Sequence, residues 1–144
     1  MGTDSKLLSD YQWSHNPRGM HNQGRMNIDK LIEQRMGIAK LVALGDEYVS
    51  DALRMMENNI TPIIRIWRPQ FSGKPMDAEL ERQFRSYLNA GIKWFEFYNE
   101  PNLFVEWPPG ANFDPLNVGG VIAPLCENWL NWARDRDAPG SQPR

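Results

Sequence analysis

The chain has 144 residues and a net charge of -2 at pH 7, with 16 Lys and Arg against 18 Asp and Glu. That length suffices for one domain with a hydrophobic core. The basic residues are scattered, which argues against nucleic-acid binding because phosphate recognition requires clustered cations. The single cysteine, Cys126, excludes an intramolecular disulfide framework and a zinc site built from cysteines.

The sequence also indicates no membrane association. No stretch reaches the length of a membrane-spanning helix. Residues 1–10 carry neither the basic start nor the apolar core of a signal peptide. We therefore expect a cytoplasmic protein, or a secreted one if a longer precursor supplies the signal, with neither a membrane nor a nucleic acid as its partner.

Short apolar runs alternate with helical patterns four times, which is typical of βα units around a parallel sheet. The predicted strands are 7–15, 38–44, 60–67 and 92–98, and the predicted helices are 27–36, 49–56, 80–88 and 124–132. The first strand is the weakest pattern, and we expect a loop over 17–24 to follow it. Asn27 and Gly91 are predicted helix caps, and Pro124 is expected near the first turn of its helix.

The predicted fold class is α/β, of the (β/α)8 TIM-barrel type, with about four βα units in this chain. Residues 1–136 would form the amino-terminal half of such a catalytic domain, and 137–144 a disordered tail or a truncation point. Four units fit half of an eight-stranded barrel or a small open sheet, and periodicity alone does not choose between them. A half barrel would leave two strand edges unpaired, so a homodimer through those edges is an alternative assembly.

Residues 94–102, Trp-Phe-Glu-Phe-Tyr-Asn-Glu-Pro-Asn, form a strand pattern that ends abruptly. A carboxylate at a strand end faces solvent or a ligand while rigid backbone supports it, as a general acid or base requires. Glu100 is therefore the candidate catalytic residue. Glu96 lies four residues earlier on the same strand face, and a carboxylate deeper in a barrel requires a partner. We expect a structural ion pair with Arg65 on the neighbouring strand, in preference to Lys40.

Residues 96–102, Glu-Phe-Tyr-Asn-Glu-Pro-Asn, resemble the strand-four signature of the clan A glycoside hydrolases, which are retaining (β/α)8 enzymes. The resemblance implies a glycosidase that hydrolyses O-glycosyl bonds in carbohydrate or polysaccharide degradation and needs no cofactor. It implies that Glu100 protonates the departing glycosidic oxygen and later activates water. It also implies that Asn99 hydrogen-bonds the 2-hydroxyl of the sugar, and the acidic residue that commonly precedes the acid/base by four positions corresponds to Glu96.

The departure from that family is the nucleophile, which is a second glutamate at the end of strand seven. A retaining site needs two carboxyl groups about 5 to 5.5 Å apart, and the predicted elements stop after four βα units. Glu106 lies in the same Pro- and Gly-rich loop, 101–120, whose length is typical of a binding or gating loop. The family gives Glu106 no such role, so we expect this chain alone to be inactive.

Three further residues are candidate substrate contacts. Trp67 and Trp107 lie at or beyond strand ends, where an indole either stacks on a sugar ring or packs within a core or loop. His15 would flank the rim of the barrel. No His, Asp and Glu residues have the spacing of metal ligands, so no metal site is predicted.

Two other functions remain open. The chain could be a non-catalytic carbohydrate-binding or self-assembling half-barrel module, completed by a second copy or another chain. It could also be a barrel enzyme of different chemistry, because the fold does not dictate the reaction.

Overall fold

The computed structural model describes residues 14–23 and 27–137. In chain order its elements are β1 (Gly19–Gln23), α2 (Ile28–Glu33), β2 (Ile38–Ala43), α3 (Val49–Glu57), β3 (Thr61–Ile66), α4 (Ala78–Asn89), β4 (Trp94–Glu96), the 3-10 helix η1 (Phe104–Glu106) and α5 (Val118–Asp137).

The chain divides into two compact units. The sheet unit comprises the described residues up to Trp67 together with Ala78–Phe97. The loop unit comprises Arg68–Asp77 and the described residues from Tyr98 onward. The aromatic run therefore crosses from one unit into the other between Phe97 and Tyr98, directly before the Asn-Glu-Pro motif.

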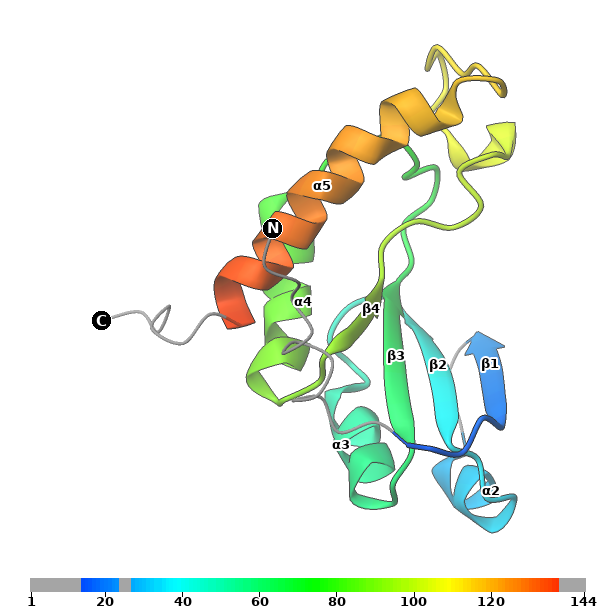
Figure 1. Ribbon diagram of the computed structural model, residues 1–144, viewed down its shortest axis with the longest axis vertical. Coiled ribbons are helices and arrows are strands. Elements are labelled where there is room, and N and C mark those ends of the chain that lie inside the picture. The colour runs from blue at the N-terminus through cyan, green and yellow to red at the C-terminus, as the bar shows by residue number, and fades with distance from the viewer. Residues whose placement is uncertain (1–13, 24–26, 138–144) are drawn as a thin grey trace, which may run out of the picture. The chain divides into compact units, whose positions relative to one another are not determined.

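The sheet unit is built on four parallel strands in the order β1-β2-β3-β4 (Figure 1). Each strand lies next to the one that precedes it in the sequence, so every βα connection moves the chain one strand further in the same direction. In the register, Leu41 of β2 is opposite Ile64 of β3, which is opposite Phe95 of β4. The predicted α/β class, with a parallel sheet and alternating helices, is confirmed.

The two faces of this sheet differ in exposure because successive residues of a strand point to opposite sides. On β2, Ala39, Leu41 and Ala43 are fully buried, whereas the residues between them are half-buried. On the buried side, the Phe84 ring of α4 lies 5.2 Å from the Phe95 ring in an edge-to-face contact. The helices therefore cover one face, and the other face stays partly exposed among the described residues.

Local sequence explains where the helices of the sheet unit begin and end. The side chain of Asn27 accepts the N–H of Lys30 at 3.2 Å, which confirms the predicted N-cap of α2. Asn59, after α3, and Gly91, after α4, have φ values of 58° and 89°, the left-handed conformation that ends a helix. The predicted C-terminal cap at Gly91 is thus confirmed.

The first strand was predicted in the wrong place. Strand β1 is Gly19–Gln23, inside the segment expected to be a loop, and residues 14 and 15 are not in a strand. The remainder of the predicted strand, 7–13, lies outside the described residues. Strand β1 has the sequence Gly-Met-His-Asn-Gln and pairs with β2 through its backbone. An edge strand held by backbone bonds needs no apolar alternation, so periodicity gave no signal here.

The loop unit consists of η1, α5 and irregular segments, and its described residues contain no strand. Helix α5 begins at Val118, so Pro124 lies inside the helix and the prediction that placed it near the first turn was wrong. Trp129 of α5 is buried, and its ring meets those of Tyr98 and Phe71 at 5.9 and 6.4 Å. These three rings pack together within the unit.

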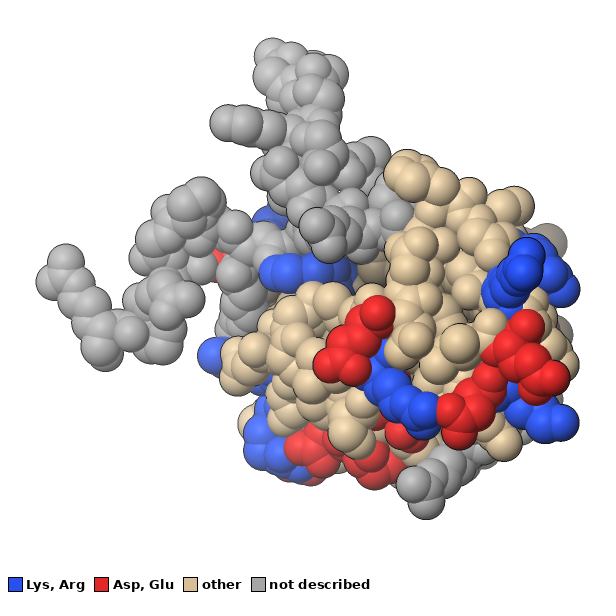
Figure 2. Space-filling model, turned by 90° about the horizontal axis from the view of Figure 1, so that it is seen from below, with Lys and Arg blue, Asp and Glu red and all other residues tan. Residues whose placement is uncertain are grey.

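Charged side chains of both signs are interspersed on the face shown in Figure 2. Ion pairs of the sheet unit's helices include Arg54 with Asp29, and Arg85 with Glu81 at 2.5 Å. Mixed charges of this kind are typical of a solvated surface. Across the described part of the chain, no helix combines the length and apolarity needed to cross a membrane.

Candidate functional site

Asn99 and Glu100 follow β4 at the start of the loop unit. Glu100 has a φ of 29°, which is uncommon for a residue with a side chain and costs conformational energy. Its carbonyl accepts the N–H of Leu103 at 2.8 Å, so the chain turns sharply at this point. The turn leaves Glu100 exposed and Asn99 half-buried.

The Asn99 amide joins two carboxylates. Its Nδ2 donates to Oε1 of Glu106 at 2.6 Å and lies 3.4 Å from Oε2 of Glu100. The shorter contact is a charge-assisted hydrogen bond. The two carboxylate oxygens can be no farther apart than the sum of these distances. The structure thus brings the two predicted residues of the motif together with a third residue, Glu106.

Ser72 links the two main-chain segments that carry Asn99 and Glu106. Ser72, which is buried, donates its N–H to the carbonyl of Glu106 at 2.9 Å. Its Oγ donates to the carbonyl of Asn99 at 3.4 Å. Ser72 therefore bonds the main chain at Asn99 and at Glu106, the two residues whose side chains are in contact.

Trp107 closes the same loop from the other end. Its side chain is 5 % exposed, and its Nε1 donates to the carbonyl of Pro101 at 2.7 Å. Gly73 packs against the indole: a Cβ there would lie 2.5 Å from Cζ3 of Trp107. Of the two roles that the sequence left open for Trp107, this geometry is that of loop packing.

Glu96, on the half-exposed face of the sheet, is paired with two cations of the sheet unit. Lys40 Nζ lies 2.8 and 2.7 Å from its two carboxylate oxygens, and Arg65 lies 3.8 Å from Oε1. Arg65 is buried, with 8 % of its side chain exposed. The ion pair with Arg65 is present, but Lys40, the less favoured partner in the sequence prediction, makes the closer contacts.

Trp67 and His15 belong to the sheet unit, and both are exposed. Trp67 follows β3 directly, and its N–H donates to the carbonyl of Ala43 at 2.7 Å, so the backbone of the ladder continues to this residue. The residue as a whole is 43 % exposed. An exposed indole at a strand end retains the surface needed to stack on a ring.

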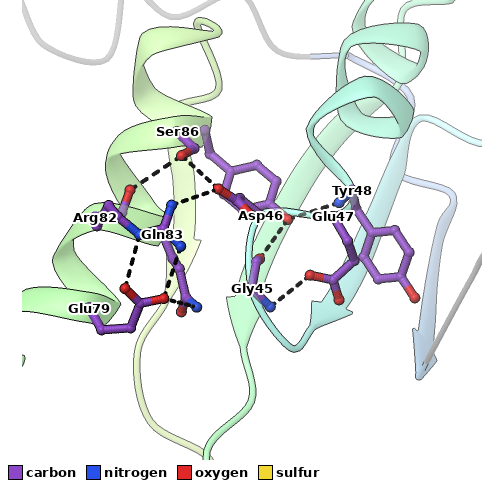
Figure 3. A network of polar contacts seen from close by, with 9 residues as sticks. Gly45, Asp46, Glu47, Tyr48, Glu79, Arg82, Gln83 and Ser86 are labelled. Carbon is purple, nitrogen blue, oxygen red and sulfur yellow. Dashed lines mark hydrogen bonds and ion pairs between the residues drawn. The ribbon is translucent and has the colours of Figure 1, made fainter.

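A second polar network joins the loop after β2 to α4 (Figure 3). Asp46 accepts from Arg82 and from the hydroxyl of Ser86, each at 3.0 Å. These two hydrogen bonds, the one from Arg82 first, hold the pKa of Asp46 below its usual value. The hydroxyl of Tyr87 donates to the carbonyl of Gly45 at 3.0 Å, and burial raises the pKa of that phenol. The network fixes the loop to the helix.

Two residues near the motif were missed or left without a role by sequence reasoning. Glu106 had no family role, and only its position in the same loop as Glu100 hinted at proximity. Phe104 is 63 % exposed and contacts the ring of Phe113 at 5.7 Å. No spacing rule distinguishes such an exposed loop aromatic from its neighbours.

No group of three or more His, Cys, Asp or Glu side chains suited to a metal ion occurs within residues 14–23 and 27–137. Comparison with known proteins adds no assignment: no family model matches the chain, and neither a curated protein nor a solved structure is significantly similar to it.

Proposed function

We propose that this chain is the amino-terminal half of a (β/α)8 glycoside hydrolase in which Glu100 is the general acid/base and Asn99 binds the sugar. The observation that carries the proposal is the position of the Asn99–Glu100 pair. It follows the fourth strand of a parallel sheet and sits at a backbone turn that exposes the carboxylate.

The strand order supports a barrel. Doubly wound sheets reverse their strand order at a switch point and carry helices on both faces. Here the order β1-β2-β3-β4 has no reversal, and one sheet face is buried while the other is half-exposed. An order without reversal is expected for consecutive strands of a (β/α)8 barrel, in which the second sheet face would be covered only on closure and the catalytic residues come from the carboxyl ends of the strands.

The chemistry proposed for Glu100 is proton transfer at the glycosidic oxygen. In the first step the protonated carboxyl gives its proton to the departing oxygen while a nucleophile attacks the anomeric carbon. In the second step the carboxylate takes a proton from the water that releases the sugar. Asn99 would hydrogen-bond a ring hydroxyl that holds the sugar in position. The nucleophile remains unassigned, so the isolated 144-residue chain is expected to show no turnover of aryl glycosides.

Affinity labelling tests the proposal without requiring turnover. N-bromoacetyl glycosylamines of glucose, galactose, mannose and xylose place an alkylating arm where an acid/base carboxylate lies. We expect at least one of them to esterify Glu100 faster than bromoacetamide does, as read by peptide mass spectrometry. An excess of the matching methyl glycoside should slow the labelling.

Two variants serve as controls. Glu100→Gln should lose the label, whereas Glu127→Gln, at an exposed position of α5, should retain it on Glu100. Labelling of Glu100 at the same rate by all four sugars and by bromoacetamide would overturn the assignment.

The second candidate is a self-assembling half-barrel module. It is favoured by the edges of the sheet, because β1 pairs with β2 alone and β4 with β3 alone within the described structure. Two copies joined edge to edge would give eight strands, the number of a closed (β/α)8 barrel. Light scattering on a size-exclusion column tests this: a dimer without sugar-directed labelling supports the module, and a monomer at all concentrations opposes it.

A further inference from the structure

We infer that Glu106 is a positioning residue for the Asn99–Glu100 site and that it acts through the side chain of Asn99. The inference rests on the proposed function, because it assumes that Asn99 binds a sugar. It adds a residue to which the family resemblance gives no role.

The hydrogen bond between Asn99 and Glu106 has a fixed direction. Asn99 Nδ2 donates to Glu106 at 2.6 Å and also faces the carboxylate of Glu100 at 3.4 Å. Turning the amide over would place its Oδ1 against both carboxylates, so that acceptors would face acceptors. Glu106 therefore fixes which end of the amide faces the carboxylates, and with it the polarity that Asn99 presents to a ligand.

Glu106 is held in place through its main chain. Its N–H donates to the carbonyl of Leu103 at 3.1 Å, and its carbonyl accepts the N–H of Ser72 at 2.9 Å. The next residue, Trp107, is buried, and its indole N–H donates a hydrogen bond to the carbonyl of Pro101. A carboxylate on such a support keeps a partner side chain in place, as a site that aligns a substrate requires.

Asn99 and Glu106 also share a main-chain hydrogen-bond partner, Ser72. Ser72 donates to the main-chain carbonyls of both Asn99 and Glu106, so the two main-chain segments are linked independently of the contact between the side chains. The Asn99–Glu106 hydrogen bond is thus not needed to close the loop. Its specific effect is on the orientation of the amide, and removing it should change the site more than the fold.

The test compares Glu106→Ala, which removes the acceptor, with Glu106→Gln, whose Oε1 still accepts from Asn99. Glu127→Ala, on α5, is the matched control. The first readout is the side-chain amide of Asn99 in a nitrogen–proton correlation spectrum. We expect Glu106→Ala to move the two amide protons upfield, Glu106→Gln to move them less, and Glu127→Ala to leave them unchanged.

The second readout is the rate of labelling of Glu100 by whichever N-bromoacetyl glycosylamine labels the parent chain fastest, divided by the rate with bromoacetamide. Misplacing a substrate-aligning group costs roughly tenfold to a hundredfold. We expect a loss of that size in Glu106→Ala, a partial loss in Glu106→Gln, and no change in the bromoacetamide rate.

The outcomes separate the two proposals. If the parent chain shows no preference for the sugar probe, the glycosidase assignment fails, and the positioning role toward a sugar fails with it. If the preference is present but Glu106→Ala retains it, or if the Asn99 amide resonances do not move, only the inference about Glu106 is overturned. Equal losses with both probes would indicate a structural role and would also overturn it.

Discussion

The sheet unit and the loop unit are ordered by different kinds of contact. In the sheet unit, parallel backbone ladders carry the architecture, and buried aliphatic side chains such as Leu41 and Ile64 fill one face. In the loop unit, individual side chains donate hydrogen bonds to main-chain carbonyls. The indole N–H of Trp107 donates to Pro101, and the hydroxyl of Tyr98 donates to Lys74 at 2.7 Å. Ladder bonds tolerate substitutions that keep the alternation, whereas each of these side-chain bonds depends on the identity of one residue. Substitutions in the loop unit should therefore act locally, on the site.

The largest effect is expected from Phe84→Ala in the sheet unit. Phe84 is buried and meets Phe95 and Phe97 edge to face at 5.2 and 5.6 Å. Deleting a buried phenylalanine costs about 3 to 5 kcal/mol of the free energy of unfolding, measured by urea titration with far-ultraviolet circular dichroism. Phe104→Ala in the loop unit should cost no more than about 1 kcal/mol, the value of an aromatic pair. Equal costs would contradict the contrast between the units.

Two glycines allow a matched comparison of backbone strain and steric clash. Gly73 in the loop unit and Gly91 in the sheet unit have φ values of 77° and 89°. Alanine in this region costs about 1 to 2 kcal/mol at either position. A Cβ at Gly91 meets nothing within 4 Å, whereas one at Gly73 would strike the ring of Trp107. Overpacking adds about 1 to 3 kcal/mol, so Gly73→Ala should be the costlier variant.

Hydrogen exchange shows which part of the chain is destabilised by Gly73→Ala. In Gly73→Ala, peptides covering 98–107 should lose protection, because Trp107 must shift away from the carbonyl of Pro101. Peptides of β2 and β3 should keep theirs. Loss of protection in the strands, with 98–107 unchanged, would refute the local account.

Sequence periodicity predicted the sheet unit well, because apolar alternation and helical spacing report directly on which side chains a core buries. The strands at 38–44 and 60–67 and the helices that follow them were predicted close to their observed bounds. The strand at Gly19–Gln23 was missed since it has one large apolar residue, Met20, and is ordered by pairing with β2. Pairing through backbone hydrogen bonds alone places no requirement on the hydrophobicity of successive side chains, so this strand shows no apolar alternation.

The site was predictable only in part. The Asn-Glu-Pro motif was visible as a sequence of residues, and its position after a strand followed from the aromatic run before it. The contact of Asn99 with Glu106 was not, because it depends on a sharp turn at Glu100 and on Ser72, which lies far away in the sequence. For Glu96, the sequence identified both cations but ranked Arg65 above Lys40. That order depends on side-chain reach across two strands, which register alone does not give.

Two tyrosines test whether the hydroxyl bridges of the two units are equivalent. Tyr87 accepts the N–H of Tyr48 and donates to Gly45 in the sheet unit. Tyr98 accepts the indole N–H of Trp129 at 3.2 Å and donates to Lys74 in the loop unit. Phenylalanine at either position removes both hydrogen bonds of the hydroxyl, at a cost that reaches about 1 to 3 kcal/mol where the groups that lose their partner are buried. We expect the larger loss at Tyr87, which is the more deeply buried residue.

The same tyrosines predict a loss of stability at alkaline pH. Burial raises the pKa of both phenols above that of the unfolded chain. Their contribution is therefore complete below about pH 10, the pKa of an unperturbed tyrosine, and it is lost as the pH rises toward the folded value. Urea midpoints should fall less steeply with rising pH in Tyr87→Phe and in Tyr98→Phe than in the parent chain. If the urea midpoints of the variants and of the parent chain fell equally steeply with pH, the alkaline loss of stability would not come from these two tyrosines.

Glu96→Gln tests the ion pairs on the half-exposed sheet face. The substitution removes the carboxylate charge that pairs with Lys40 and with the buried Arg65. Breaking a fully buried pair costs 3 to 5 kcal/mol, and because Glu96 is a third exposed we expect about 1 to 2 kcal/mol. Arg54→Ala, which removes a solvent-exposed pair with Asp29, should cost less than about 0.5 kcal/mol. If Glu96→Gln and Arg54→Ala lost similar unfolding free energy, the ion pairs of Glu96 would be no stronger than a solvent-exposed pair.

The smallest effect is expected at Asp46, whose pKa is lowered first by its hydrogen bond from Arg82 and then by that from Ser86. A carboxylate with a lowered pKa stabilises the fold above the unfolded value of about 3.9, and the contribution is lost as the pH falls through the folded value. Asp46 and Arg82 are both solvent-exposed, so the stabilisation is below about 0.5 kcal/mol. Asp46→Asn should therefore be slightly less stable than the parent chain near neutral pH, and the two should converge in acid. Glu57→Gln, at the exposed end of α3, should show no such convergence.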